Sequence, residues 1–114
     1  MCLVLIVEGM NDRQQILNAK PLCELDFVVT GGTKMNNGIK NNIDKHLQKG
    51  NRLVLLTDPD EAGDQIVQMV QRFYPSIPRV EVNKDEANYF TGRKYKYGVE
   101  YCGHKYLREL IGGL

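Results

Sequence analysis

The sequence predicts an α/β fold built on a parallel sheet of about four strands, in the order 2-1-3-4, with helices on both faces of the sheet. Continuous apolar runs such as CLVLIV at residues 2–7 are typical of strands that are buried on both faces. Segments with apolar residues at helical spacing separate these runs. Strands that alternate with helices along a chain indicate a parallel sheet covered by helices.

The expected strands are short apolar runs, at residues 2–7, 25–30, 52–57 and 79–82. A first helix is expected to start in MNDRQQIL, where Asn11 can cap the helix and Gln14 can answer it three residues later. The buried faces of the other helices are predicted from apolar residues three or four positions apart: Ile39, Ile43 and Leu47; Ile66, Val70 and Phe73; and, near residues 103–111, Leu107, Leu110 and Ile111. Right-handed crossovers then place the loop after every strand at the same edge of the sheet.

Composition excludes several classes of protein. The chain has 114 residues without an evident linker or internal repeat, so residues 1–114 are expected to form a single domain. Its net charge of +1 predicts no overall attraction to nucleic acid, so an anionic partner must meet a local patch of charge. No apolar run approaches the roughly 20 residues that span a bilayer, so no membrane partner is expected. The scattered cysteines, 3 in number, favour reduced thiols and a cytoplasmic location.

Three acidic residues follow two of the predicted strands: Glu8 after the first, and Asp58 and Asp60 after the third. In the order 2-1-3-4 these two strands are neighbours, and such folds bind ligands in the crevice at the carboxyl ends of the strands. Carboxylates roughly 5 Å apart repel each other by about 3 kcal/mol at an effective dielectric of 20. A hard divalent cation removes this conflict, and Mg²⁺ binds a few carboxylate oxygens and bridges to phosphate. The sequence therefore predicts a Mg²⁺ site formed by these three side chains.

Each of these acids also has a plainer interpretation. Asp60 can cap the following helix, and Glu8 can be an ordinary acid at the end of a strand. A calcium-binding loop is excluded, because Ala62 and Met69 occupy positions of DPDEAG and its continuation where that loop needs oxygen ligands. A receiver domain also gathers acids after its first and third strands, and Lys84 could supply its lysine. A receiver domain, however, pairs its acids after the first strand, and this chain pairs them after the third.

The segments VEGMND and LLTDPDEAGDQI together resemble the Toprim domain of topoisomerases, bacterial primases and several nucleases. The signature of that domain is a glutamate and a glycine after the first strand, and two aspartates one residue apart followed by a glycine after the third. Here these positions are Glu8-Gly9 and Asp58-x-Asp60, with Gly63 behind them. The segments KDEA and GVE further resemble ribonuclease M5, which matures 5S ribosomal RNA, and small single-domain Toprim proteins. The resemblance implies a Toprim or Rossmann-like fold for nearly the whole chain.

The resemblance implies Mg²⁺-dependent hydrolysis of phosphodiester bonds in structured RNA, such as a 5S ribosomal RNA precursor. In this scheme Asp58 and Asp60 hold Mg²⁺. Glu8 either completes the metal shell or acts as general base on the attacking water. Lys84 would stabilise charge on the reacting phosphate, and Glu100 would be an outer carboxylate for a second ion.

Two basic segments are candidates for binding the nucleic acid. GRKYKYG interleaves tyrosines with Arg93, Lys94 and Lys96, so that cations can meet phosphates while Tyr95 stacks on an unpaired base. Its plainer interpretation is an exposed loop or edge strand. TGGTKMNNG lacks the spacing of a P-loop and its glycines favour a tight turn, but Lys34 beside them could meet a phosphate.

An alternative function is a Toprim module that binds metal and nucleic acid but does not cleave without a partner domain. The full ribonuclease has a further C-terminal domain, and a separate protein partner could likewise recognise the RNA. Family members also commonly place an acid and then a base in the helix after the two aspartates. Here Asp64 is that acid, and no base follows it closely.

Overall fold

The computed structural model describes residues 2–114 and contains a four-stranded parallel sheet. The strands are β1 (Leu3–Val7), β2 (Leu25–Val29), β3 (Arg52–Thr57) and β4 (Arg79–Glu81). They are hydrogen-bonded in the order β2-β1-β3-β4, and every neighbouring pair is parallel. The predicted fold class and strand order are confirmed.

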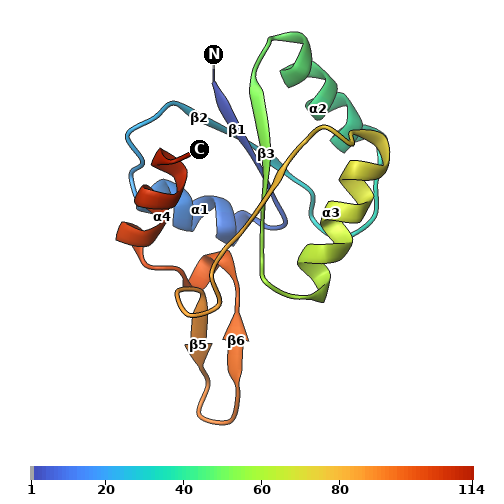
Figure 1. Ribbon diagram of the computed structural model, residues 1–114. Coiled ribbons are helices and arrows are strands. Elements are labelled where there is room, and N and C mark those ends of the chain that lie inside the picture. Colours follow the sequence, from blue (N-terminus) through green and yellow to red (C-terminus); the bar gives the residue numbers. More distant parts are fainter. Residues whose placement is uncertain (1) are drawn as a thin grey trace.

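Within residues 2–114, the α-helices are α1 (Met10–Asn18), α2 (Asn37–Gln48), α3 (Glu61–Phe73) and α4 (His104–Gly112). Figure 1 shows α1 and α4 on one side of the sheet and α2 and α3 on the other, as predicted. Each pair of helices closes its own hydrophobic core against the sheet. In this part of the chain, no helix has the length and apolar composition needed to cross a bilayer.

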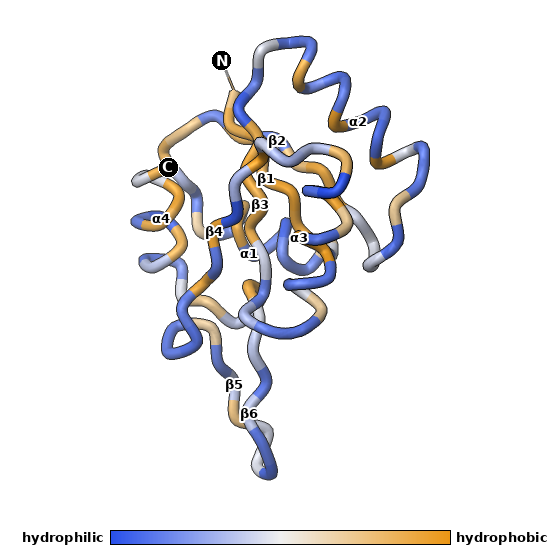
Figure 2. The backbone as a smooth tube through the Cα atoms, turned by 45° about the vertical axis from the view of Figure 1, so that its right-hand side comes forward, coloured by the Kyte–Doolittle hydropathy of each residue, from blue (hydrophilic) through white to orange (hydrophobic). Residues whose placement is uncertain are grey.

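The two cores explain why β1 is a continuous apolar run. Leu5 and Val7 pack in the core beneath α1 and α4, whereas Val4 and Ile6 pack in the core beneath α2 and α3. Figure 2 shows hydrophobic residues concentrated in the central strands, whereas hydrophobic and hydrophilic residues alternate along α2. Burial of apolar surface stabilises a fold by about 25 cal/mol per Å². The loops after β1 and β3 therefore follow strands that are buried on both faces.

The start of α1 differs from the prediction. The helix begins at Met10, with Gly9 as the cap residue, so the predicted cap Asn11 and its partner Gln14 are wrong. The chain turns directly from β1 into the helix, and the Gly9 N–H donates to Asp12 Oδ2 at 3.1 Å. This hydrogen bond is the half of a capping box that the third helical residue supplies. It places an unpredicted acid beside the carboxyl end of β1.

The buried face of α2 also differs from the prediction at its end. Ile39 and Ile43 are buried as expected, but Leu47 is 44% exposed and His46 is buried in its place. The buried residue that follows Ile43 is therefore three positions further along the helix, and not four as predicted. A nitrogen of the His46 ring, Nδ1, lies 3.0 Å from the side-chain amide of Asn51, which satisfies this buried polar group.

The last turn of α3 is less buried than predicted. Ile66 and Val70 lie in the core, but Phe73 is 46% exposed and Met69 is buried instead. For α4, Leu107 and Ile111 are buried as predicted, and Leu110 is partly buried against the same core.

The segment after β4 forms an antiparallel hairpin that the sequence does not predict. Strand β5 (Asn88–Phe90) pairs with β6 (Tyr95–Tyr97), and a short 3₁₀ helix, η1 (Val99–Tyr101), leads into α4. Figure 1 shows the hairpin projecting from the main body of the molecule. Its strand residues are all exposed.

Candidate metal and active site

A pocket of about 400 Å³ lies at the carboxyl ends of β1 and β3. Because these strands are parallel neighbours, Glu8 after β1 and Asp58 after β3 come to the same edge of the sheet. Glu100 from η1 and Asp12 from α1 line the same pocket. The structure thus places three predicted residues with an unpredicted acid in what we term the acidic pocket.

Asp58 is held by three separate segments. Its Oδ1 accepts a hydrogen bond of 2.7 Å from the Val99 N–H, and a Cβ added at Gly98 would lie 3.4 Å from both carboxylate oxygens. Its backbone carbonyl accepts a 3.3 Å hydrogen bond from Arg79 Nη2. A Cβ added at Gly63 would lie only 2.1 Å from the same carbonyl oxygen. The glycine of the DPDEAG segment is therefore required by close packing against the Asp58 backbone.

Asp60 caps α3. Its Oδ1 accepts a 2.7 Å hydrogen bond from the Gly63 N–H, and its side chain does not line the acidic pocket. The capping interpretation is thus observed for one oxygen. A carboxylate has two oxygens, so capping leaves Oδ2 available to another partner.

Burial and mutual repulsion raise the pKa of two acids in the pocket. Burial is the main cause for Asp12, whose pKa rises to about 7, and the charge of Asp58 adds to it. Burial also raises the pKa of Asp58, more than its backbone hydrogen bond lowers it. The charges of Asp60, Glu8 and Glu100 raise it further. The pocket therefore contains more negative charge than the protein alone neutralises.

This set of donors fits a hard divalent cation. The charged side chains that line the acidic pocket are all carboxylates, which are the ligands preferred by Mg²⁺. A cation would also favour the ionised forms of Asp12 and Asp58, which burial disfavours. As the side chains stand, residues 2–114 contain no group of three or more His, Cys, Asp or Glu positioned to hold an ion. The acids share a pocket without converging on one point, so binding an ion requires side-chain rotation.

Asp12 is the acid that the sequence prediction misses. Its spacing of three residues from Gly9 is the signal that could identify it, because a glycine cap followed by an acid at that spacing forms half of a capping box. The misplaced cap at Asn11 conceals this signal.

A second missed residue, Arg79 of β4, braces the turn around Asp58. Its Nη1 donates to Asp64 Oδ1 at 2.7 Å, and its Nε donates to Thr57 Oγ1 at 2.8 Å. Asp64, the acid in α3 that follows the two aspartates, is therefore paired with Arg79 of β4 and not with a base in α3.

Two predicted lysines lie outside the acidic pocket. Lys84 lines a separate pocket with Tyr95 and Tyr97, and its Nζ lies 5.5 Å from the Tyr97 ring centroid. Its role at the reacting phosphate stays a prediction, and that role would require its ammonium group to leave this ring. Lys34 is exposed in the loop between β2 and α2.

The predicted nucleic-acid-binding residues of the hairpin are all exposed. Arg93 and Lys94 lie in the turn, and Tyr95 and Lys96 lie in β6. Tyr95 is 56% exposed and has three cations beside it in the chain, and its role in binding nucleic acid stays a prediction.

The hairpin has one predominantly aromatic face. Paired residues of an antiparallel ladder lie on the same face, so the pairing of Phe90 with Tyr95 puts these rings together, with Tyr97 two residues further along. Ring centroids are 4.9 Å apart for Phe90 and Tyr95, and 6.5 Å apart for Tyr95 and Tyr97. Tyr89 pairs with Lys96 on the opposite face. We refer to Phe90, Tyr95 and Tyr97 as the aromatic face.

Comparison with known families agrees with this geometry. A family profile described as Toprim domain matches residues 3–84, which include Glu8, Asp58 and Asp60. The chain therefore belongs to the Toprim domain family, and the resemblance in its sequence motifs is confirmed.

Several curated relatives are ribonucleases. Ribonuclease M5 of Staphylococcus aureus is 27% identical over 107 residues, which cover 94% of this chain and 56% of that protein. Ribonuclease M5 of Lactococcus lactis is 27% identical over 114 residues, covering 96% of this chain and 52% of that protein. The chain thus spans about half the length of these curated relatives.

A solved structure has the same fold. The small TOPRIM domain protein from Bacillus stearothermophilus matches with a TM-score of 0.72 and 22% sequence identity. The match covers 97% of this chain and 83% of that chain. This similarity supports the architecture of the sheet and its helices.

Proposed function

We propose that this chain, as a single Toprim domain over residues 1–114, is a Mg²⁺-dependent nuclease that cleaves structured RNA in the manner of ribonuclease M5. The observation that carries the proposal is the acidic pocket, where Glu8 and Asp58, from the carboxyl ends of adjacent strands, share one lining with Glu100 of η1. The similarity to ribonuclease M5 proteins supports RNA as the substrate. A precursor of 5S ribosomal RNA is the first substrate to test.

The acids have distinct proposed roles. Asp58, fixed by the Val99 N–H, and Asp60, through the oxygen not used in capping, would hold the ion. Glu8 would complete the ion's ligands or accept a proton from the attacking water. Glu100 would be an outer carboxylate. When bound, Mg²⁺ supplies positive charge that offsets the charge of the phosphodiester and polarises its P–O bonds.

The hairpin would bind the RNA. The aromatic face offers rings on which unpaired bases can stack, at about 1–3 kcal/mol per base. Arg93 and Lys94 in the turn would contact phosphates. Lys96 on the opposite face and Lys34 on the β2–α2 loop would contact further phosphates of the RNA strand.

A second candidate function is a module that binds metal and RNA but needs a partner domain to cleave. One observation favours it: the acids do not converge without side-chain rotation. In that case a separate protein or domain would complete the RNA recognition and the alignment needed for cleavage.

A cleavage assay separates these functions. The purified protein is incubated with a labelled 5S ribosomal RNA precursor, in Mg²⁺ or in EDTA, and compared with Asp58→Ala. Asp26→Ala is the matched control, because Asp26 is an exposed aspartate of β2 outside the acidic pocket. Mg²⁺-dependent cleavage that only Asp58→Ala abolishes supports the nuclease. Binding without cleavage supports the module, and absence of both cleavage and binding overturns both functions.

A further inference from the structure

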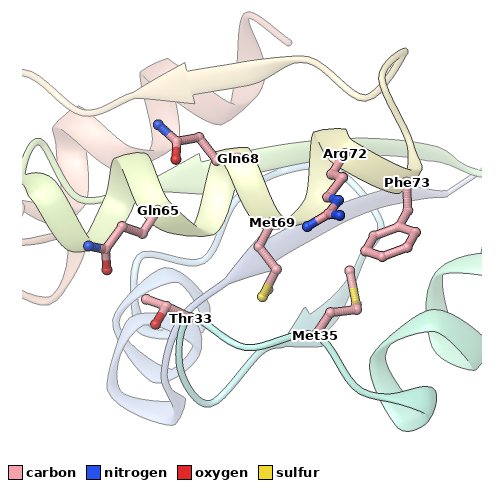
Figure 3. Close-up of a pocket in the computed structure, with 7 residues that line it drawn as sticks. All are labelled: Thr33, Met35, Gln65, Gln68, Met69, Arg72 and Phe73. Atoms are coloured by element: carbon pink, nitrogen blue, oxygen red, sulfur yellow. The ribbon is translucent and has the colours of Figure 1, made fainter.

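A groove of about 530 Å³ lies between α3 and the loop that connects β2 to α2. Figure 3 shows Thr33 and Met35 of the loop facing the α3 side chains Met69, Arg72 and Phe73. Among residues 2–114, no carboxylate lines this groove, in contrast to the acidic pocket. We term it the α3 groove.

The far end of the α3 groove combines an exposed aromatic ring with positive charge. Phe73 is 46% exposed, and Lys40 Nζ lies 3.9 Å from its ring centroid. The Arg72 guanidinium lies 6.0 Å from the same centroid, and Arg72 forms no ion pair within residues 2–114. Asp44, on the same helix as Lys40, accepts a 2.7 Å hydrogen bond from the Tyr74 hydroxyl. Within the described chain, the groove thus has a guanidinium without a carboxylate partner beside a ring that solvent can reach.

The near end of the α3 groove adjoins the acidic pocket. One loop lines both sites, because Gly31 borders the acidic pocket and Thr33 borders the groove. Residues two positions apart are separated by at most about 7 Å. Lys34, next to Thr33, is exposed. A chain-like ligand that reaches the acidic pocket therefore finds the groove within a short distance, with positive charge along the way.

We propose that the α3 groove binds the RNA strand next to the cleavage site, with a phosphate at Arg72 and an unpaired base against Phe73. The proposal rests on the proposed function, since it takes the RNA to be held at the acidic pocket. Nucleic-acid strands are bound by this combination of cations for the backbone and rings for the bases. Because the groove is lined by uncharged side chains and Arg72, a phosphate there would not meet the repulsion of the acidic pocket.

The test measures the dissociation constant for the 5S ribosomal RNA precursor in EDTA, over a range of salt concentrations. Arg72→Gln is expected to weaken binding about 3–10-fold and to reduce the slope of log affinity against log salt by about 0.7–1, the value of one phosphate contact. Phe73→Ala is expected to weaken binding about 10-fold with an unchanged slope, because stacking is not ionic. Arg72→Lys should keep the slope.

The matched control is Arg108→Gln, which removes the same charge from α4 on the other side of the sheet. It should change neither affinity nor slope. If Arg72→Gln and Phe73→Ala leave both quantities at wild-type values while the wild type binds and cleaves RNA, the α3 groove has another occupant, such as a protein segment. That result overturns this inference and leaves the proposed function standing. If the wild type binds no RNA, both fail together.

Discussion

The acidic pocket and the β5–β6 hairpin are built in opposite ways. In the pocket, Asp58 and Asp12 are each held by a backbone N–H, from Val99 and Gly9, and their burial is energetically costly for the charged forms. In the hairpin, the rings of the aromatic face are exposed and contact one another. The pocket rests on the central strands, whereas the hairpin strands belong to neither core.

This contrast suits two different tasks, a reaction at phosphate and the binding of a nucleic-acid strand. A reaction at phosphate needs charges at fixed positions, which a packed core can supply at some cost in stability. Binding a flexible strand needs accessible rings and cations, which an exposed hairpin supplies without burying charge. We therefore expect substitutions in the pocket to change cleavage and stability, and substitutions in the hairpin to change affinity.

The largest effect is expected for Asp58→Asn. The amide oxygen can still accept the Val99 hydrogen bond, but the negative charge is lost. Cleavage should fall by at least about 100-fold, since metal affinity depends strongly on ligand charge. The thermal midpoint in EDTA should rise, because burial and neighbouring acids disfavour the charged form. A lower midpoint in calorimetry would show that the charge of Asp58 does not destabilise the folded protein. Retained cleavage would show that this carboxylate is not needed to hold the ion.

Gly63→Ala tests whether the pocket depends on close packing. The new Cβ would lie 2.1 Å from the Asp58 carbonyl oxygen, so the turn must shift. We expect a loss of about 1–3 kcal/mol in the free energy of unfolding, the usual cost of overpacking. The control is Gly112→Ala, at a helix position where an added Cβ meets no atom within 4 Å. Urea denaturation should show the control within about 1 kcal/mol of wild type; equal losses in both variants would refute the packing argument.

The pH dependence of stability tests the charge in the pocket. The Asp12 pKa rises from 3.8 to about 7 on folding, so the folded state binds more protons than the unfolded state between these values. Stability without metal should therefore fall as pH rises through this window, and each tenfold difference in proton affinity between the two states corresponds to about 1.4 kcal/mol. Asp12→Asn should flatten the profile, and Mg²⁺ should stabilise the protein more at pH 8 than at pH 5. If the stability of the wild type depended on pH no more than that of Asp12→Asn, the raised pKa of Asp12 would be excluded as the cause.

The smallest effects are expected in the hairpin, where its two faces provide their own control. Tyr95→Ala removes the central ring of the aromatic face and should weaken RNA binding about 10-fold, with stability nearly unchanged. Tyr89, on the opposite face, already stacks on Tyr101 with ring centroids 5.4 Å apart. Tyr89→Ala should therefore weaken binding less than about 3-fold. Fluorescence anisotropy can measure both, and equal effects would mean that the faces do not differ in function.

Much of the fold and part of the site could be predicted from sequence, for a physical reason. Strands such as β1 and β3 are buried on both faces, which produces the apolar runs that are typical of a central parallel strand. Once their adjacency is predicted, the residues directly after them must share an edge, so Glu8 and Asp58 are found together.

Other features depend on details that periodicity does not contain. Asp12 is missed because the helix begins at Met10, one residue before the predicted cap Asn11. The hairpin strands are three residues long and wholly exposed, so neither burial nor alternation marks them. The position of Lys84 over a tyrosine ring depends on where the hairpin folds back, which sequence spacing leaves open.

The hydrogen bond from Val99 to Asp58 connects the two regions directly. β6 ends at Tyr97, and only Gly98 separates that strand from the amide that holds the carboxylate. Only two peptide units therefore separate the proposed RNA-binding hairpin from the proposed ion ligand. If RNA binds as proposed, a shift of β6 on binding would move the amide that positions the Asp58 carboxylate.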